Sequence, residues 1–380
     1  MTRDPLEADP GAAPFGPQHA ALRAEVRAWV ATHLAPYADE WEMAREFPRS
    51  VFADAGRAGL LGWKYGSEWG GRGPDPLADV VISEELVRCG SGGVAAGLGA
   101  TKDLAPYYIA RFGTDAQRAA WLPAAVAGDS IAGLAVTEPD AGSDVAAITT
   151  RARREGDNWV LDGSKTFCTN GSRADWVLVA ARTTEEPGAH ALSLFVVPTT
   201  APGFTATRIP TLGWRTSHTG ALHLDGVRLP SAALLGGEQE GFVMIMKSFQ
   251  WERLGLAVGA LAAATQNLIA ARELMGHGPH RWHHRLVELT GELVAARALT
   301  YDAVVDHLNG REPLRHVSAA KWLACDLDVE TAVLRLAVAT SYSDAEALRA
   351  ERALRDARLG PIGGGAREVM AELVARTLAM

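Results

Sequence analysis

The chain has 380 residues, 48% of them hydrophobic, so it can bury a large core and is long enough for two or three domains. Its formal net charge of -8 argues against a nucleic-acid or anionic-membrane surface, which would need clustered Lys and Arg. Its three cysteines, Cys89, Cys168 and Cys325, form no Cys-x-x-Cys pair, which disfavours a disulfide framework or a structural zinc site. We therefore expect a cytoplasmic protein without a metal and without a nucleic-acid or membrane partner.

The first half of the chain reads as a leader followed by helices. Residues 1–17 lack the apolar core of a signal peptide, and we expect them to form a short disordered leader. From residue 18 to residue 129, apolar residues recur at three- and four-residue spacing, which is typical of helices, and glycine-rich breaks separate the helical stretches. Residues 18–129 are therefore predicted to form an N-terminal helical domain.

The periodicity changes twice more along the chain. Residues 130–240 contain short runs of alternating polarity separated by Gly, Asp and Pro, which predict an antiparallel β-domain. Residues 241–380 return to helical spacing. The uncharged run Leu254 to Ala271 just reaches the roughly 18 residues of a membrane span, but its Ala, Gly, Thr and Asn content favours a buried helix. The predicted fold class is α+β, with a ligand site expected where the three parts meet.

Two loops could hold a flat cofactor with polar edges. The stretch LAVTEPDAGSD, residues 134–144, offers backbone amides and short hydroxyls in a glycine-bearing loop. Further on, Phe167 could pack on a ring and Thr169 could bond its edge. By composition alone, an ordinary turn and a half-buried strand explain these stretches equally well.

Several motifs together resemble the acyl-CoA dehydrogenase family. TEPDAGSD, GSKTFCTNG, LDGVRLPSAALLGGEQEGF, WERL and DARLGPIGGGAREVM follow one another in the family's order and spacing, and the resemblance covers nearly the whole chain. It implies an N-terminal helical domain, a middle antiparallel β-domain and a C-terminal four-helix bundle. It also implies an FAD bound between the β-domain and the C-terminal helices.

The resemblance implies α,β-dehydrogenation of an acyl thioester, either an acyl-CoA or an acyl-carrier-protein thioester. In the family a carboxylate removes the α-proton while the β-hydrogen leaves as hydride to flavin N5, and a carrier such as electron-transfer flavoprotein takes the electrons. The α-C–H is a poor acid in water, so this chemistry needs a desolvated base and preplaced donors for the developing enolate oxygen.

The expected base sits in the first helix of the C-terminal bundle. Most family members carry it in a C-terminal Tyr-Glu-Gly-Thr segment, but that position is Gly364 here. A subset that resembles isovaleryl- and long-chain acyl-CoA dehydrogenases instead places an acid directly before an arginine in that helix, as Glu252 and Arg253 are placed here. We therefore predict Glu252 as the base, and a Gly364 N–H that donates to the thioester carbonyl. Glu368, the acid nearest the lost site, is the alternative.

The same resemblance assigns the remaining site residues. Ser143, Gln250 and Arg253 would approach the substrate. The flavin ring would be bound by main-chain groups and side chains of eight residues, with Phe167 in the place usually held by Trp: Leu134, Val136, Thr137, Gly142, Ser143, Phe167, Cys168 and Thr169.

Two family motifs are missing. The Arg-x-x-Phe-Gly segment after the first bundle helix is replaced by a shorter stretch containing His277, His280, His283 and His284, and Ala337–Ser341 stands where Gln-x-x-Gly-Gly is usual. In the family both elements cross a dimer interface to hold the neighbour's FAD. The chain therefore either binds FAD through altered contacts as a homo-oligomer or pairs with a homologous subunit.

Three functional readings follow. The leading one is the FAD-dependent dehydrogenase with Glu252 as base. The second keeps the fold but uses oxygen, as an acyl-CoA oxidase or flavin monooxygenase. The third is a subunit of a heteromer, either completed by its partner or without activity of its own. The retained Glu252 argues against an inactive subunit. No motif identifies the acyl group of the substrate.

Overall fold

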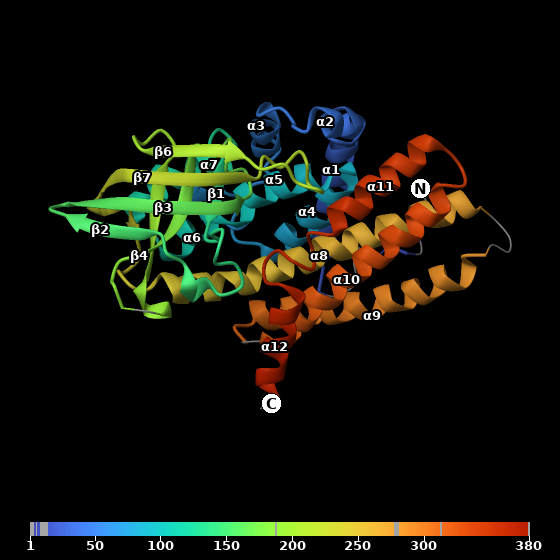
Figure 1. Cartoon of the computed structure of the whole chain (residues 1–380). Helices are drawn as coiled ribbons and strands as arrows, with labels where there is room; N and C mark the ends of the chain where they lie inside the picture. Colours follow the sequence, from blue (N-terminus) through green and yellow to red (C-terminus); the bar gives the residue numbers. More distant parts are fainter. Residues whose placement is uncertain are drawn as a thin grey trace.

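The computed structural model describes residues 4, 6, 7, 14–186, 188–276, 281–311 and 314–378. Its helices and strands follow the predicted order of helices, sheet and helices, and the expected fold class is confirmed. In Figure 1 the sheet lies at one end of the molecule and helices α9–α11 lie at the other, while α8 extends through both regions.

The N-terminal part consists of seven helices. Their ends follow local sequence signals: Asp75 accepts hydrogen bonds from the first amides of α4, and Thr114 and Gln117 form a capping box at the start of α7. The helices are α1 (Pro17–His33), α2 (Ala38–Ala44), α3 (Ser50–Arg57), α4 (Pro76–Leu86), α5 (Gly92–Asp103), α6 (Ala105–Phe112) and α7 (Asp115–Val126).

The predicted disordered leader lies mostly outside the described residues, but residues 4, 6, 7 and 14–17 of it are described, and three of them make the following contacts with the rest of the chain. Leu6 is buried among apolar side chains of the C-terminal helices, Asp4 pairs with Arg272, and Glu7 pairs with Arg88. These contacts were not predicted from the sequence: one apolar side chain and two carboxylates have partners on other parts of the chain.

The middle part forms one sheet of eight strands in the order β6-β7-β3-β2-β4-β5-β8, with β1 beside β4. Most neighbours are antiparallel, as predicted, but β1 runs parallel to β4 and so does the end of β2. The β2–β3 hairpin lies between β1 and β4 in the chain and provides the long connection that parallel neighbours need. The strands are β1 (Ala132–Ala135), β2 (Arg151–Glu155), β3 (Asn158–Cys168), β4 (Trp176–Arg182), β5 (Leu192–Pro198), β6 (Phe204–Arg208), β7 (Gly220–Pro230) and β8 (Leu234–Leu235).

The C-terminal part contains four long helices and a shorter terminal one. They are α8 (Gly241–Met275), α9 (His283–Leu308), α10 (Leu314–Ala339), α11 (Asp344–Ala357) and α12 (Arg367–Thr377). Helix α8 is long and apolar enough to cross a membrane, but over half of its most apolar window is buried, as in the core helix of a soluble protein.

Helix α8 connects the three parts through three successive sets of contacts. Met244 and Ile245 at its start join a core that the sheet shares with α6 and α7, and Leu254 and Val258 join the core of the N-terminal helices. Leu268 and the other apolar residues of its second half pack among α9 and α10. The segment between the first two sets therefore lies where all three parts of the molecule meet.

Candidate active site

The Glu252 carboxylate lies in that junction segment of α8. Its Oε2 atom is buried and has no hydrogen-bond partner in the part of the chain that the structure describes. A buried acceptor without a partner is rare, because desolvation of a polar group costs free energy unless a hydrogen bond replaces the lost water. Glu252 is thus an unsatisfied carboxylate in a place where a ligand could supply the missing partner.

Burial raises the pKa of Glu252 from its ordinary value to about 7. The positive charges of Arg253 and Lys321 oppose this rise, and the negative charge of Asp103 adds to it. A carboxylate with a pKa near neutrality is a stronger base than an exposed one and is still substantially ionised at neutral pH.

Gly364 lies directly beside this carboxylate. A Cβ atom built on Gly364 would lie 3.7 Å from Glu252 Oε1 and 2.4 Å from the Cδ1 atom of Leu256. The backbone of Gly364 has a φ of 66°, a region in which glycine carries no steric penalty. The two residues that the sequence paired are therefore neighbours, and a side chain at position 364 would crowd Leu256.

Two cations hold residues 360–365, which we call the glycine loop, in place. Arg253 Nε donates to the Gly364 carbonyl at 3.1 Å, and Lys321 Nζ donates to the carbonyls of Gly360 and Gly365, each at 2.7 Å. Within the described chain, the Gly364 N–H has no hydrogen-bond partner. The loop thus presents a free backbone donor close to Glu252, as an oxyanion-binding amide would.

The predicted flavin loop is attached to the sheet through a buried ion pair. Glu138 accepts hydrogen bonds from the amides of Thr149 and Thr150 and from Lys165 Nζ, and Lys165 also donates to the Val136 carbonyl at 3.0 Å. This network fixes the path of the chain through Leu134, Val136 and Thr137, whereas Gly142 and Ser143 beyond it are exposed.

Phe167 projects from a β-bulge at the end of β3. Lys165 pairs with Leu222 and Cys168 with Gly220, so β3 carries one more residue than β7 over this stretch. Phe167 has a φ of 56° and is 65% exposed. An aromatic residue with positive φ is a conformational outlier that a packed surface seldom tolerates without a functional reason.

The residues after Phe167 point in alternate directions. Cys168 is buried in the core of the sheet, where burial raises the pKa of its thiol to about 12. A Cys168 contribution to a cofactor site must therefore come from its main chain, while Thr169 remains half-buried. Asn170 ties this strand end to α5 by donating to the Gly97 carbonyl at 2.9 Å.

The three predicted substrate residues differ in their surroundings. Ser143 is exposed and Gln250 is half-buried. Arg253 is only 5% exposed, and its Nε is engaged by the Gly364 carbonyl. Its observed contact is therefore with the glycine loop.

A buried ionic cluster next to Glu252 was not predicted from the sequence. We define the tetrad as Lys64, Asp79, Lys102 and Asp103. Lys102 bonds Asp79 at 2.5 Å and Asp103 at 2.7 Å, and Lys64 bonds the same two carboxylates. Lys321 was also missed. Both the tetrad and Lys321 could have been suspected from charged residues within apolar stretches, such as AAKWL around Lys321.

Two buried hydroxyls lie near the same place. Tyr108 OH and Ser248 Oγ lie close enough to interact with each other, and among the described residues they have no other hydrogen-bond partner. The charge of Glu252 also acts on Tyr108. Together with Glu252 Oε2, they bring buried polar atoms with unused hydrogen-bonding capacity to one region, which indicates a polar ligand site.

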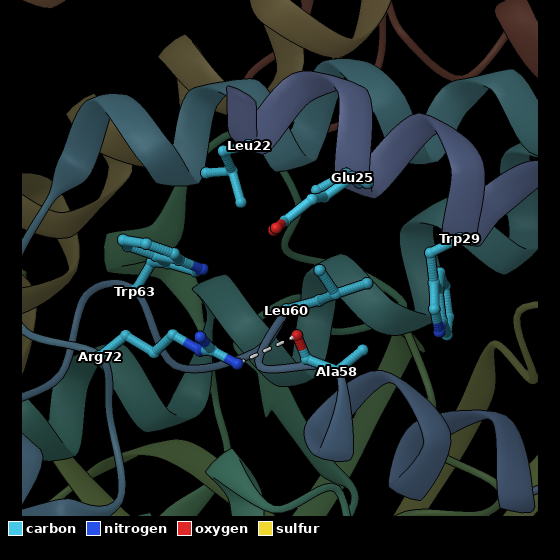
Figure 2. A pocket seen from close by; sticks show the side chains of 8 residues that line it. Leu22, Glu25, Trp29, Ala58, Leu60, Trp63 and Arg72 are labelled. Atoms are coloured by element: carbon cyan, nitrogen blue, oxygen red, sulfur yellow. Dashed lines mark hydrogen bonds between the residues drawn. The ribbon is translucent and has the colours of Figure 1, made fainter. Parts of the chain in front are cut away.

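A separate pocket opens between α1 and the segment after α3 (Figure 2). Leu22, Trp29 and Trp63 line it, and Arg72 lies over the Trp63 ring and donates to the Ala58 carbonyl. None of the predicted site residues lines this pocket.

Comparisons with known proteins agree with this arrangement. Family models match the N-terminal domain of acyl-CoA dehydrogenases at residues 16–129, the middle domain at 133–227 and the C-terminal domain at 239–379. The long-chain specific mitochondrial acyl-CoA dehydrogenase of Rattus norvegicus is 34% identical over 376 residues, covering 96% of this chain and 87% of that protein.

Solved structures show the same similarity. The crystal structure of an acyl-CoA dehydrogenase from Geobacillus kaustophilus matches with a TM-score of 0.92 and 31% identity, covering 97% of this chain and 100% of that one. A glutaryl-CoA dehydrogenase from Mycobacterium smegmatis, solved in complex with FADH2, matches with a TM-score of 0.86 and 27% identity, covering 96% and 95%. The chain belongs to the acyl-CoA dehydrogenase family of FAD-dependent oxidoreductases.

Proposed function

We propose that this chain catalyses the α,β-dehydrogenation of an acyl thioester, with Glu252 as the base that removes the α-proton. The observation that carries the proposal is the placement of the Glu252 carboxylate, buried and lacking a partner for Oε2, beside a glycine at position 364. An exposed surface acid would show neither the unsatisfied oxygen nor the raised pKa.

The chain's own groups account for the proton transfer. Glu252, deprived of water, accepts the α-proton at a carboxylate oxygen and becomes a neutral acid. The Gly364 N–H donates to the thioester carbonyl oxygen, which gains negative charge as the α-proton leaves. Arg253 and Lys321 fix the loop that presents this amide, so that no reorganisation is needed during the step.

The residues of the predicted cofactor site fit a flat ring. An exposed aromatic ring at a bulge and a loop fixed by Glu138 and Lys165 provide a stacking surface beside main-chain donors. We propose that Leu134, Val136, Thr137, Gly142, Ser143, Phe167, Thr169 and the main chain of Cys168 hold the flavin. When bound, FAD accepts the β-hydrogen with its electron pair.

A screen of thioesters tests the proposal. The purified protein, with its FAD content measured first, is mixed anaerobically with acyl-CoAs and acyl-carrier-protein thioesters while flavin absorbance is followed. Bleaching by at least one thioester is expected, and no bleaching by any of them would count against the function. Rapid peroxide formation in air would favour an oxidase, whereas reoxidation by electron-transfer flavoprotein would support that carrier as the acceptor.

We also propose that the chain works with a homologous subunit. This proposal rests on the absence of the Gln-x-x-Gly-Gly motif at Ala337–Ser341, where α10 ends, and of the Arg-x-x-Phe-Gly motif after α8. His283 and His284 in the replacement segment are exposed, and His277 and His280 lie outside the described residues. Purification of the chain alone as a homo-oligomer with one FAD per chain would refute the mixed assembly. The cytoplasmic location stays a prediction.

A further inference from the structure

The wall of the site next to Glu252 is charged. In the tetrad, Lys64 Nζ lies 5.0 Å from the ring centroid of Trp251, which directly precedes the base, and 5.2 Å from that of Tyr107. Asp103 lies close enough to Glu252 for its negative charge to affect the carboxylate. The tetrad therefore borders the region where the acyl group of a substrate would lie.

Three side chains of the tetrad are fully enclosed, and the fourth is partly exposed. The side chains of Lys64, Asp79 and Lys102 are 4%, 3% and 1% exposed, whereas that of Asp103 is 20% exposed. Among the described residues, both lysines bond Oδ1 of Asp103. Oδ2 faces Gly99 of α5, where an added Cβ would meet nothing nearer than this oxygen at 3.9 Å. A carboxylate oxygen thus remains available beside open space.

An unsubstituted alkyl chain fits this wall poorly. Covering Asp103 Oδ2 with methylene groups would remove water from a charged acceptor without replacing its hydrogen bond. The buried hydroxyls of Tyr108 and Ser248 have only each other as partners, so an alkyl chain would also leave part of their hydrogen-bonding capacity unused. A pocket for a saturated tail is normally lined by apolar side chains. The lining here instead matches a substrate that brings a donor of its own.

Building on the function proposed above, we propose that the acyl group carries a hydrogen-bond donor, a hydroxyl or an amino group, beyond its β-carbon, and that Asp103 accepts this hydrogen bond. Asp103 is thereby a specificity-determining residue. A site built to bond a polar group discriminates strongly against an analogue that lacks it, because the buried acceptor is then left unpaired.

The test compares flavin reduction by three series of acyl-CoAs of matched chain length: alkanoyl, ω-hydroxyacyl and ω-aminoacyl. The full-length protein with bound FAD, together with any partner subunit it needs, is used throughout. At the best length, the kcat/KM of a hydroxyl- or amino-bearing substrate is expected to exceed that of the alkanoyl substrate by about tenfold or more. The hydroxyl and amino arms identify which donor is used.

Two matched variants assign the preference to Asp103. Asp103→Asn removes the charged acceptor and is expected to lower the ratio of substituted to alkanoyl kcat/KM by about tenfold or more. Asp79→Asn removes the same charge from the same tetrad at a position closed to the site, and is expected to leave the ratio unchanged within about threefold. Since a ratio of two substrates is measured on one protein, a loss of stability in either variant does not alter its interpretation.

The outcomes separate this inference from the function on which it rests. Equal or better use of alkanoyl substrates by the wild type would overturn the inference while leaving the dehydrogenase intact. A similar fall of the ratio in both variants would also overturn it, because Asp103 would then act only as a part of the tetrad. Failure of every thioester to reduce the flavin would instead contradict the proposed function.

Discussion

Glu252 owes its chemistry to its surroundings, because a glutamate at the surface of a helix would be a weak base. Burial without a hydrogen-bond partner raises its pKa to about 7, and the nearby charges of Arg253, Asp103 and Lys321 partly cancel. Desolvation is therefore the dominant effect. The arginine next to it limits the rise, so that the carboxylate can still ionise at neutral pH.

The pH dependence of flavin reduction follows from this pKa. Only the ionised carboxylate can accept the α-proton, so the rate at low, non-saturating substrate should increase through a pH near 7 and level off above it. Stopped-flow measurement of the pH profile checks this. In Asp103→Asn the midpoint should move to lower pH, since a neighbouring negative charge is removed. A flat profile from pH 5 to 9 would contradict the assignment.

Gly364 should not tolerate a side chain. In Gly364→Ala the new Cβ would lie 2.4 Å from Leu256 Cδ1, and the alanine would have to adopt a φ of 66°. Strain of this kind costs about 1–3 kcal/mol, and we expect kcat/KM to fall about tenfold or more through displacement of the loop amide. Gly363→Ala is the matched control, because Gly363 does not have a positive φ and its Cβ would come no nearer than 3.2 Å to Leu359. Equal losses in the two variants would refute the prediction.

At the scale of elements, the glycine loop depends on α10. Lys321 is fully buried on α10 and holds the carbonyls of Gly360 and Gly365. In Lys321→Met both hydrogen bonds are lost and the loop is freed. We expect kcat/KM to fall about tenfold while FAD content stays unchanged, measured by steady-state kinetics and absorbance. Lys247→Met on the exposed face of α8 should have no comparable effect.

The bulge in β3 should matter for the cofactor rather than for proton transfer. Phe167→Ala removes the exposed ring from a strand whose core residues are unchanged, so the fold should persist. Loss of one stacking contact, about 1 kcal/mol, should weaken FAD retention several-fold in a dialysis assay. Phe167→Trp should restore it. Unchanged FAD affinity in Phe167→Ala would show that the ring does not contact the flavin.

The sequence predicts a feature of these elements when the residues of a single motif determine it, and fails when pairing between distant segments determines it. The pairing of Glu252 with Gly364 was predictable, because an acid gained in one motif accompanies an acid lost in another. The bulge that turns Phe167 outward was not predicted, since it depends on the register between β3 and β7. The parallel neighbours β1 and β4 escaped prediction for the same reason.

For the molecule as a whole, periodicity and motifs together predicted the order of helices, sheet and helices, and Glu252 lies at the junction where a site was expected. They could not predict the tetrad, because Lys64 and Asp103 are 39 residues apart and come together only through tertiary packing. The role of Lys321 was hidden in the same way, since its loop lies 39 to 44 residues further along the chain.

Helix α8 is the feature on which the architecture and the chemistry both depend. It joins cores in all three parts of the molecule, and Glu252 lies where its first two sets of contacts meet. An acid at this position is removed from water by the docking of three units rather than by one local turn. Glu252 is therefore predicted to be active only in the fully assembled fold.

The central claim, that Glu252 is the base, is tested most directly by anaerobic flavin reduction in Glu252→Gln. The amide keeps the shape of the side chain but accepts no proton. We expect unchanged FAD content and a fall in the reduction rate of about a thousandfold or more, with Glu368→Gln on the exposed start of α12 close to wild type. Undiminished reduction in Glu252→Gln, or a large loss in Glu368→Gln instead, would contradict the account.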